Sequence, residues 1–268
     1  MNNIEKSITG VYRLDEIAQR DIWINKLSPL AKLITTVAYI ATVVSFNKYD
    51  FTGLLGMIIY LIVLFVLGDI SFKESLVRLR IVLPIVCIVG IINPFMDRGV
   101  ILTIGGIGIS GGVISMITLM MKGVFSVLSS YIFIASTSIE KIGHAFRQLH
   151  IPKVIVTMIL LIYRYIIVFM KEVLKISQAY SLRAPGQKGI NIKSWGPLVG
   201  QLILRSYDRA DMVYSSMCLR GFNGEFPVSD ENCGVKGVLK GILFVLIVGV
   251  YLYVFRKYPV FEIVGGMM

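Results

Sequence analysis

The sequence predicts an all-α, polytopic membrane helix bundle with about five spans and an amphipathic helical region on the cytoplasmic side. Of its 268 residues, 56% are hydrophobic and only 16% are charged, whereas soluble domains carry about a quarter charged residues. The aliphatic residues lie in long unbroken blocks, and the net charge of +11 comes from Lys and Arg located mostly between those blocks. Basic residues in such positions follow the positive-inside rule. Much of the chain is therefore predicted to lie in the lipid bilayer.

Six apolar blocks are candidates for membrane helices, since a spanning helix needs about 20 mostly apolar residues. They cover residues 33–46 (extended back to Leu30), 51–67, 81–95, 113–135, 154–170 and 238–255. Pro84 interrupts the third block, and Asn93 with Pro94 closes it. We expect the chain to fold as a bundle of these helices.

Loop charges predict the direction in which the blocks cross. The basic residues before the first block and between the second and third include Arg13, Arg20, Lys26, Lys32, Lys73, Arg78 and Arg80. The loop between the first and second blocks is only four residues long. This asymmetry predicts a cytoplasmic N-terminus. The fourth block then returns to the cytoplasmic side, and the last block leads outward.

The fifth block breaks the alternation of sides. Lys153 precedes it and Lys171 and Lys175 follow it, so both of its ends have cytoplasmic character. Arg164 lies near its middle, where a cation costs about 2.5–3.5 kcal/mol on the insertion scale. We expect residues 154–170 to run along the membrane boundary. The alternative is a true span with Arg164 paired inside the bundle.

These patterns predict four regions along the chain. Residues 1–32 form a cytoplasmic N-terminal segment, and residues 33–136 form a four-helix transmembrane region. Residues 137–236 form a cytoplasmic or interfacial helical domain, because 171–236 is the least hydrophobic stretch after the N-terminus. Residues 237–268 form a C-terminal transmembrane helix and tail.

Several classes of function lack their sequence signatures. The chain has no G-x-x-x-x-G-K-[ST] loop, no G-x-S-x-G elbow and no H-E-x-x-H motif, so it should not bind ATP by itself or act as one of these hydrolases. Its two histidines, His144 and His150, are six residues apart and do not share a helix face. No cofactor and no metal site are predicted. Basic and aromatic residues are not interleaved in a polar domain, so no nucleic-acid partner is expected.

A glycine-rich segment contains a formal G-x-G-x-x-G at Gly106, Gly108 and Gly111. No βαβ unit surrounds it and no acidic residue follows at the required distance, so a dinucleotide site is not predicted. A turn, or a close helix approach through Gly108 and Gly112, is the expected structure.

Two arginines lie at predicted helix ends in the cytoplasmic region. The run from Lys171 reaches Arg183, and Pro185 prevents the helix from continuing far beyond it. A second run, 197–220, has apolar residues spaced mostly by three and four and is followed by Gly221, a good helix terminator. Cations at helix C-termini complement the macrodipole by about 0.3–1 kcal/mol. That effect alone can account for both arginines.

Four stretches carry a resemblance to a known family. They are LRSYDRA at 204–210, MCLRGFNGEFP at 217–227, SPLAK at 28–32 and IGGIGI at 104–109. Together they resemble the T component of energy-coupling-factor (ECF) transporters, closest to the cobalt branch, CbiQ. The resemblance covers nearly the whole chain.

The resemblance implies a non-enzymatic coupling subunit of an ABC importer in the cell membrane. Its expected partners are two ABC ATPase subunits, which hydrolyse ATP, a substrate-specific membrane S component and membrane lipid. The expected substrate is cobalt or nickel, and the alternative is a vitamin-specific or shared coupling subunit. The family carries two Ala-Arg-Gly signatures at the ends of cytoplasmic coupling helices, and their arginines dock into the ATPases. The matching residues are Leu182, Arg183, Ala184, Leu219, Arg220 and Gly221. Only the second glycine is kept, so the match is better at Arg220.

Two other classes of function stay open at this point. A self-contained carrier or channel should have buried charges in several spans, and only Arg164 qualifies among the predicted blocks. An intramembrane lipid-modifying enzyme usually needs clustered acidic residues or metal ligands at the membrane face, and the sequence has no such cluster.

Overall fold

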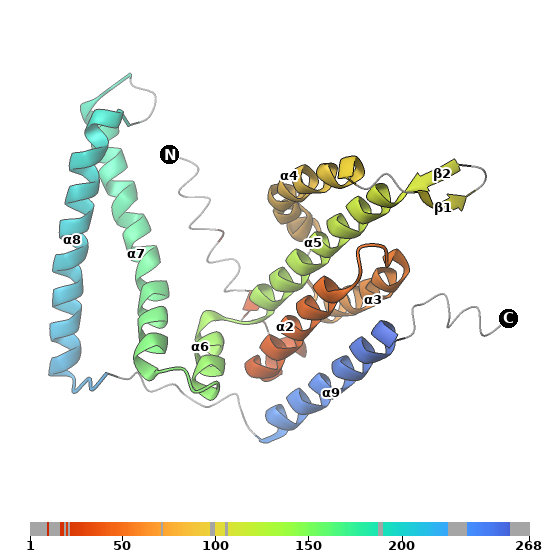
Figure 1. Ribbon diagram of the computed structural model, residues 1–268. Coiled ribbons are helices and arrows are strands. Elements are labelled where there is room, and N and C mark those ends of the chain that lie inside the picture. Colours follow the sequence, from red (N-terminus) through yellow and green to blue (C-terminus); the bar gives the residue numbers. More distant parts are fainter. Residues whose placement is uncertain are drawn as a thin grey trace. The chain divides into compact units, whose positions relative to one another are not determined.

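Figure 1 shows the computed structural model of the chain, which consists of helices and one short β-hairpin. It describes residues 10, 17–18, 20, 22–70, 72–96, 100–104, 107–186, 190–224 and 235–257. Along the chain the elements are η1 (Ile24–Lys26), α2 (Pro29–Ser45), α3 (Phe51–Gly68), α4 (Phe72–Met96), β1 (Val100–Ile104), β2 (Ile107–Ser110), α5 (Gly111–Ser136), α6 (Ile139–Gln148), α7 (Lys153–Arg183), α8 (Ile192–Leu219) and α9 (Val235–Lys257). The predicted helical class is confirmed.

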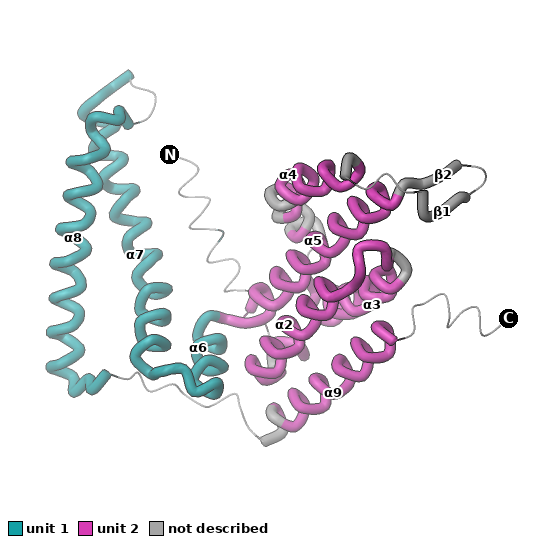
Figure 2. Tube along the Cα trace, in the orientation of Figure 1, with its two compact units in different colours: residues 1–16, 139–229 teal, residues 17–138, 230–268 magenta. Residues whose placement is uncertain are grey.

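The chain divides into two compact units, shown in different colours in Figure 2. Unit 1 consists of residues 1–16 and 139–229, and unit 2 consists of residues 17–138 and 230–268. Unit 1 therefore contains α6, α7 and α8, and unit 2 contains the other elements. The four predicted regions were drawn by membrane environment, and that assignment stays a prediction.

Unit 2 is a helix bundle built around α5. Helices α2, α3 and α4 all pack against α5, and α9 packs against α2 and α3. Small residues allow the closest approaches: a Cβ atom added at Gly123 would lie 3.0 Å from Val86, and one at Gly241 would lie 2.9 Å from the Cβ of Ser28. Small residues at such contacts are typical of membrane helix packing.

Three tyrosines connect three helices in the interior of unit 2. The rings of Tyr39 (α2) and Tyr60 (α3) stack with centroids 4.5 Å apart, and Tyr251 (α9) stacks on Tyr60 at 6.4 Å. The Tyr39 hydroxyl donates to the Met57 carbonyl at 3.0 Å, and the Tyr251 hydroxyl donates to the Gly56 carbonyl. The hydroxyls of Tyr39 and Tyr251 thereby have acceptors inside the bundle, as a buried phenol requires.

The outer surfaces of the bundle are apolar. Val66, Ile88 and Leu246 are all at least 60% exposed, as expected of side chains that face lipid. Three helices in the described part of the chain are long and apolar enough to cross a membrane, namely α5, α7 and residues Leu239–Lys257 of α9. The shorter apolar helices are Pro29–Ser45, Gly53–Gly68 and Leu83–Pro94.

One local prediction in unit 2 is wrong, and for the glycine-rich segment one of the two expected structures, the close helix approach, is excluded. Helix α4 begins at Phe72 instead of at residue 81 and continues through Pro84, because neighbouring groups in a bundle can satisfy the backbone carbonyl that a proline leaves free. Gly108 lies in strand β2, which pairs antiparallel with β1, and Gly112 lies in α5. These two glycines therefore do not line one helix. The residues between the strands, 105–106, lie outside the described residues.

Helix α7 joins two segments that the sequence analysis treated separately. It includes the apolar block 154–170 and the run that ends at Arg183. Its length and composition are sufficient for a span, so its course along the membrane boundary stays a prediction. Arg164 is exposed on α7, and unit 1 does not pair it in its interior.

Candidate functional site

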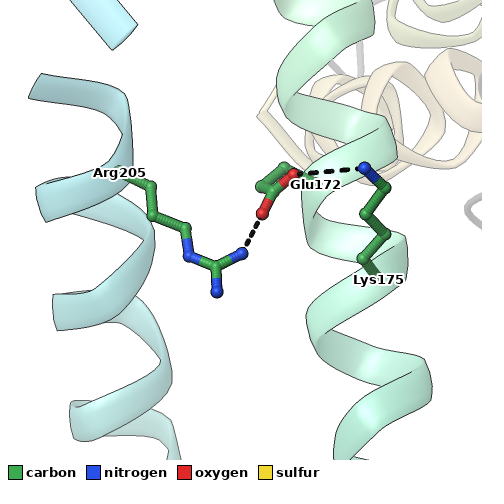
Figure 3. A network of polar contacts seen from close by, with 3 residues as sticks. All are labelled: Glu172, Lys175 and Arg205. Atoms are coloured by element: carbon green, nitrogen blue, oxygen red, sulfur yellow. Dashed lines mark hydrogen bonds and ion pairs between the residues drawn. The ribbon is translucent and has the colours of Figure 1, made fainter. Parts of the chain in front are cut away.

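Helices α7 and α8 form an antiparallel hairpin in unit 1. Figure 3 shows Glu172 of α7 between Arg205 of α8, with which it forms a hydrogen-bonded ion pair, and Lys175, whose Nζ lies 3.8 Å from a Glu172 oxygen. Near the end where the helices are joined, the Asn191 backbone N–H donates to the Tyr180 hydroxyl at 3.2 Å.

The opposite end of this hairpin is also closed by a contact. The Thr157 hydroxyl, near the start of α7, donates to the carbonyl of Gly224 at 3.4 Å, just beyond the end of α8. The C-terminus of α7 and the C-terminus of α8 therefore lie at opposite ends of the hairpin (Figure 1).

Helix α7 ends at Arg183, as the sequence predicts. Ala184 leaves the helical conformation with φ −124°, and its N–H still donates to the Tyr180 carbonyl at 3.0 Å. Pro185 follows, and Gly186 has a positive φ of 90°, which glycine adopts without strain. The end of this helix is therefore encoded by the residues adjacent to it.

Helix α8 ends in a Schellman motif around Arg220. The N–H of Phe222 donates to the Met217 carbonyl, and the N–H of Gly221 donates to the Cys218 carbonyl, both at 3.0 Å. Gly221 has φ 78°, a conformation that side chains with a Cβ rarely adopt. The glycine that matches the family signature thus has a local structural role.

The residue before each arginine is a leucine that is almost fully exposed. Leu182 is 83% exposed and Leu219 is 89% exposed. Arg183 and Arg220 are exposed as well, and neither forms an ion pair with any residue that the structure describes. The macrodipole explains a cation at a helix end, but it does not explain an exposed leucine beside it. Each helix end therefore presents an apolar and a cationic side chain together.

The two ends are far apart. Helix α8 has 28 residues and is therefore about 42 Å long at 1.5 Å per residue. Arg183 lies near the start of α8 and Arg220 lies at its end, because the hairpin is antiparallel. One compact binding pocket cannot hold both side chains, so a partner that binds both must supply two separate sites.

Comparison with known proteins identifies the family. The profile of the Cobalt transport protein family, CbiQ, matches residues 21–229. The chain belongs to this family. It is a CbiQ-like ECF T component, a membrane protein of a transporter. This family consists of membrane components of transporters and is not a family of enzymes.

Individual relatives agree with this assignment. The energy-coupling factor transporter transmembrane protein EcfT of Thermosediminibacter oceani is 29% identical over 221 residues, covering 74% of this chain and 80% of that protein. EcfT of Listeria innocua is 24% identical over 237 residues, covering 82% and 86%. An uncharacterized protein of Methanocaldococcus jannaschii is 27% identical over 238 residues, covering 84% and 80%.

Two lysines of this T component have partners that the sequence analysis missed. Lys32, counted there as a loop charge, is 5% exposed and donates to the Ser136 carbonyl at the end of α5. Lys122 lies within α5 and donates to the carbonyls of Val44 and Phe46 at the end of α2. The only sign of these contacts in the sequence was the presence of a lysine inside an apolar block. A carrier should have buried charges in its spans, but backbone carbonyls account for these two.

The described part of this T component contains no group of three His, Cys, Asp or Glu residues that could hold a metal ion. His144 lies in α6, and His150 follows that helix with φ 60°. The two helix ends, each with an exposed leucine beside an exposed arginine, form the candidate site.

Proposed function

We propose that this chain is the transmembrane coupling subunit of an ECF-type ABC importer and that Arg183 and Arg220 each dock into one ATPase subunit. The single observation that carries the proposal is the pair of exposed Leu-Arg ends at opposite ends of one helical hairpin. Two identical or similar ATPase subunits would provide two equivalent binding grooves that are separated in space. Such a pair of grooves matches two helix ends that lie at opposite ends of the hairpin.

Each helix end has the chemistry of an interface anchor. A guanidinium makes charge-assisted, bidentate hydrogen bonds that an ammonium cannot reproduce. Burial of Leu182 or Leu219 in an apolar part of the groove would remove a nearly fully exposed side chain from water. Arginine in a well-packed, desolvated pocket is typical of binding hot spots.

The hairpin can transmit motion from the ATPases. ATP-driven closure would bring the two docking sites toward each other and thereby move the ends of α7 and α8. Helix α8 has no buried residue in the structure, and it exposes Trp195, Leu204 and Tyr207. Such an uncovered apolar surface is typical of a protein interaction site. We assign it to the substrate-binding membrane subunit.

The proposed substrate is a cobalt or nickel ion. The family is described as a cobalt transport family, and cobalt uptake is the expectation that follows for this chain. Ion binding is assigned to the separate membrane subunit, in keeping with the small number of metal-ligating side chains in the apolar blocks. The proposed location is the cell membrane, with the N-terminus in the cytoplasm.

Co-purification tests the proposal. The chain is expressed together with the ATPase subunits encoded beside it and is purified in detergent, either as wild type or as Arg183→Glu plus Arg220→Glu. We expect the wild type to retain the ATPases and each charge reversal to weaken binding by roughly 30-fold, because loss of one partner of a buried charged pair costs about 2 kcal/mol or more.

A charge-matched control separates docking from a general electrostatic effect. Lys171→Glu plus Arg209→Glu reverses two exposed cations in the middle of the hairpin and should retain the ATPases. Equal binding by the wild type and the helix-end double variant would show that the two arginines are ordinary helix-end cations, and the carrier and enzyme classes would then return.

A further inference from the structure

The short linker between α5 and α6 joins the two compact units. Helix α5 ends at Ser136 and α6 begins at Ile139, and the division between the units falls between Ser138 and Ile139. Connecting segments usually run over the surface, where water satisfies their backbone groups. Here the linking residues Thr137 and Ser138 are only 2% and 6% exposed. This linker is therefore buried, unlike a typical surface connection.

The side chain of Lys32 is bonded to this linker. Its ammonium donates to the Ser136 carbonyl at 2.7 Å, and Lys32 itself is 5% exposed. The Ser136 hydroxyl donates to the Phe133 carbonyl at 3.3 Å and lies 3.4 Å from the Thr137 hydroxyl. The last carbonyls of a helix lack intrahelical partners and carry the negative end of the macrodipole. An ammonium complements both properties.

Lys122 makes the same kind of contact at the other end of α2. It is half-buried in α5 and donates to the carbonyls of Val44, at 3.2 Å, and Phe46. Helices α2 and α5 are antiparallel neighbours, and each one therefore receives an ammonium from the other at its C-terminal end. Both bonds hold α2 to α5, but only the Lys32 bond lies at the point where the chain leaves unit 2 for unit 1.

We propose that Lys32 is a positioning residue for coupling, one that fixes the end of α5 to α2. With this bond in place, the last turn of α5 cannot unwind. A displacement of α6 and of the α7/α8 hairpin therefore moves the helices of unit 2. Lys32 acts through Ser136 and contacts neither an ATPase nor a substrate in this scheme. The proposal rests on the proposed function, because it requires motion to pass between the two units.

Hydrogen–deuterium exchange tests the anchor in the purified full-length chain. The variants are Lys32→Met, which keeps the unbranched stem and removes the ammonium, Lys32→Arg, which keeps a cationic donor, and Lys122→Met as the matched control. We expect exchange of amides in residues 131–138 to rise roughly tenfold or more in Lys32→Met, because a hydrogen bond to a charged group is lost. Lys32→Arg should restore most of the protection, and Lys122→Met should leave this segment unchanged. Equal exchange in all four proteins would overturn the anchor.

Pulsed electron paramagnetic resonance tests coupling in the complex with the ATPases. One spin label is attached to the exposed native Cys218 on α8 and the other to Ile134→Cys, an exposed site on α5, with the other two cysteines replaced by Ser. We expect ATP to shift the distance distribution in the wild type and in Lys122→Met. In Lys32→Met the distribution should be broad and the shift should be lost. A full ATP-dependent shift in Lys32→Met would overturn the proposal.

Three further outcomes of these experiments bear on the role of Lys32. A role of Lys32 in stability alone would lower the thermal midpoint of Lys32→Met and leave the shift intact, which contradicts the proposal. Lys32→Met keeps both arginine ends and should retain the ATPases; if the wild type itself does not bind them, the proposed function fails while the exchange result still decides the anchor. If Lys32→Met does not accumulate in the membrane, Lys32→Gln replaces it, and it should show a partial loss of both protection and shift.

Discussion

Helices α5 and α8 are similar in length but differ in how many of their residues are buried by the rest of the chain. Helix α5 has twelve buried residues, whereas α8 has none. Unit 2 supplies packing partners on several sides of α5, namely α2, α3 and α4. Within unit 1, α8 packs against α7, and Leu198, Leu202 and Met217 are among its partly buried residues.

This difference separates two uses of apolar residues in one chain. In unit 2 they fill an interior at close packing, so substitutions there should change the stability of the chain itself. On α8 and at the helix ends they are exposed, so substitutions there should leave stability unchanged and alter only assembly. Matched pairs of substitutions, one in each region, test this difference.

The largest expected effect comes from truncating one leucine in each region. Leu54→Ala, at a side chain with 0% exposure, should lower the free energy of unfolding by about 2–5 kcal/mol, because it removes buried contacts and leaves a cavity. Leu219→Ala, at the end of α8, should change it by less than about 0.5 kcal/mol. Thermal unfolding in detergent measures both.

For the affinity toward the ATPases, we expect the larger effect from the leucine on α8 and the smaller effect from the buried leucine. Leu219→Ala should weaken association with the ATPases roughly tenfold or more, as for an anchor residue in a desolvated pocket. The properly folded fraction of Leu54→Ala should bind normally. If Leu219→Ala proved as destabilising to the isolated chain as Leu54→Ala, the distinction between the two regions would be lost.

A smaller effect is expected at the contact between α9 and α2. A Cβ atom added at Gly241 would lie 2.9 Å from the Cβ of Ser28 and 3.1 Å from that of Ala31, whereas one at Gly249, on the same helix, would meet nothing within 4 Å. Gly241→Leu should therefore destabilise unit 2 by about 1–3 kcal/mol through overpacking. Gly249→Leu should be near neutral. Equal thermal midpoints for the two variants would contradict this packing.

A still smaller effect is expected from removing a single buried hydroxyl. Tyr39→Phe removes the donor to the Met57 carbonyl and should cost about 0.5–1.5 kcal/mol, because that carbonyl loses a partner inside the bundle. Tyr207→Phe alters a residue on α8 that is 74% exposed and should leave unfolding unchanged. The two thermal midpoints, measured in the same detergent, are compared directly.

The smallest effect is expected at the ion pair that crosses the hairpin. Glu172→Gln removes the carboxylate that pairs with Arg205 and Lys175, and exposed pairs of this kind contribute about 0.2–1 kcal/mol. Amide exchange in α8 should rise slightly at low salt, and the difference from the wild type should shrink at high salt, where the pair is screened. An effect that is independent of salt would indicate a packing role for Glu172.

Much of the helical pattern could be predicted from the sequence because it depends on neighbours along the chain. Apolar blocks of sufficient length predicted α2, α3, α5 and α9 closely, and the breaks after Arg183 and Arg220 follow from Pro185 and Gly221. The prediction failed at Pro84, where propensity alone indicates an interruption and the bundle tolerates the proline. It also missed the β-hairpin before α5, because glycine-rich segments are compatible with several kinds of turn.

The helical membrane character of the chain and the positions of its two Leu-Arg helix ends can be predicted without a structure, since these features depend on composition and on residues a few positions apart. The antiparallel arrangement of α7 and α8, which puts the two ends a helix length apart, is visible only in the folded chain. The tertiary structure alone revealed that Lys32 bonds to Ser136, 104 residues away. A contact at such a separation depends on which helices pack together, and no local pattern of charge or hydropathy specifies that choice.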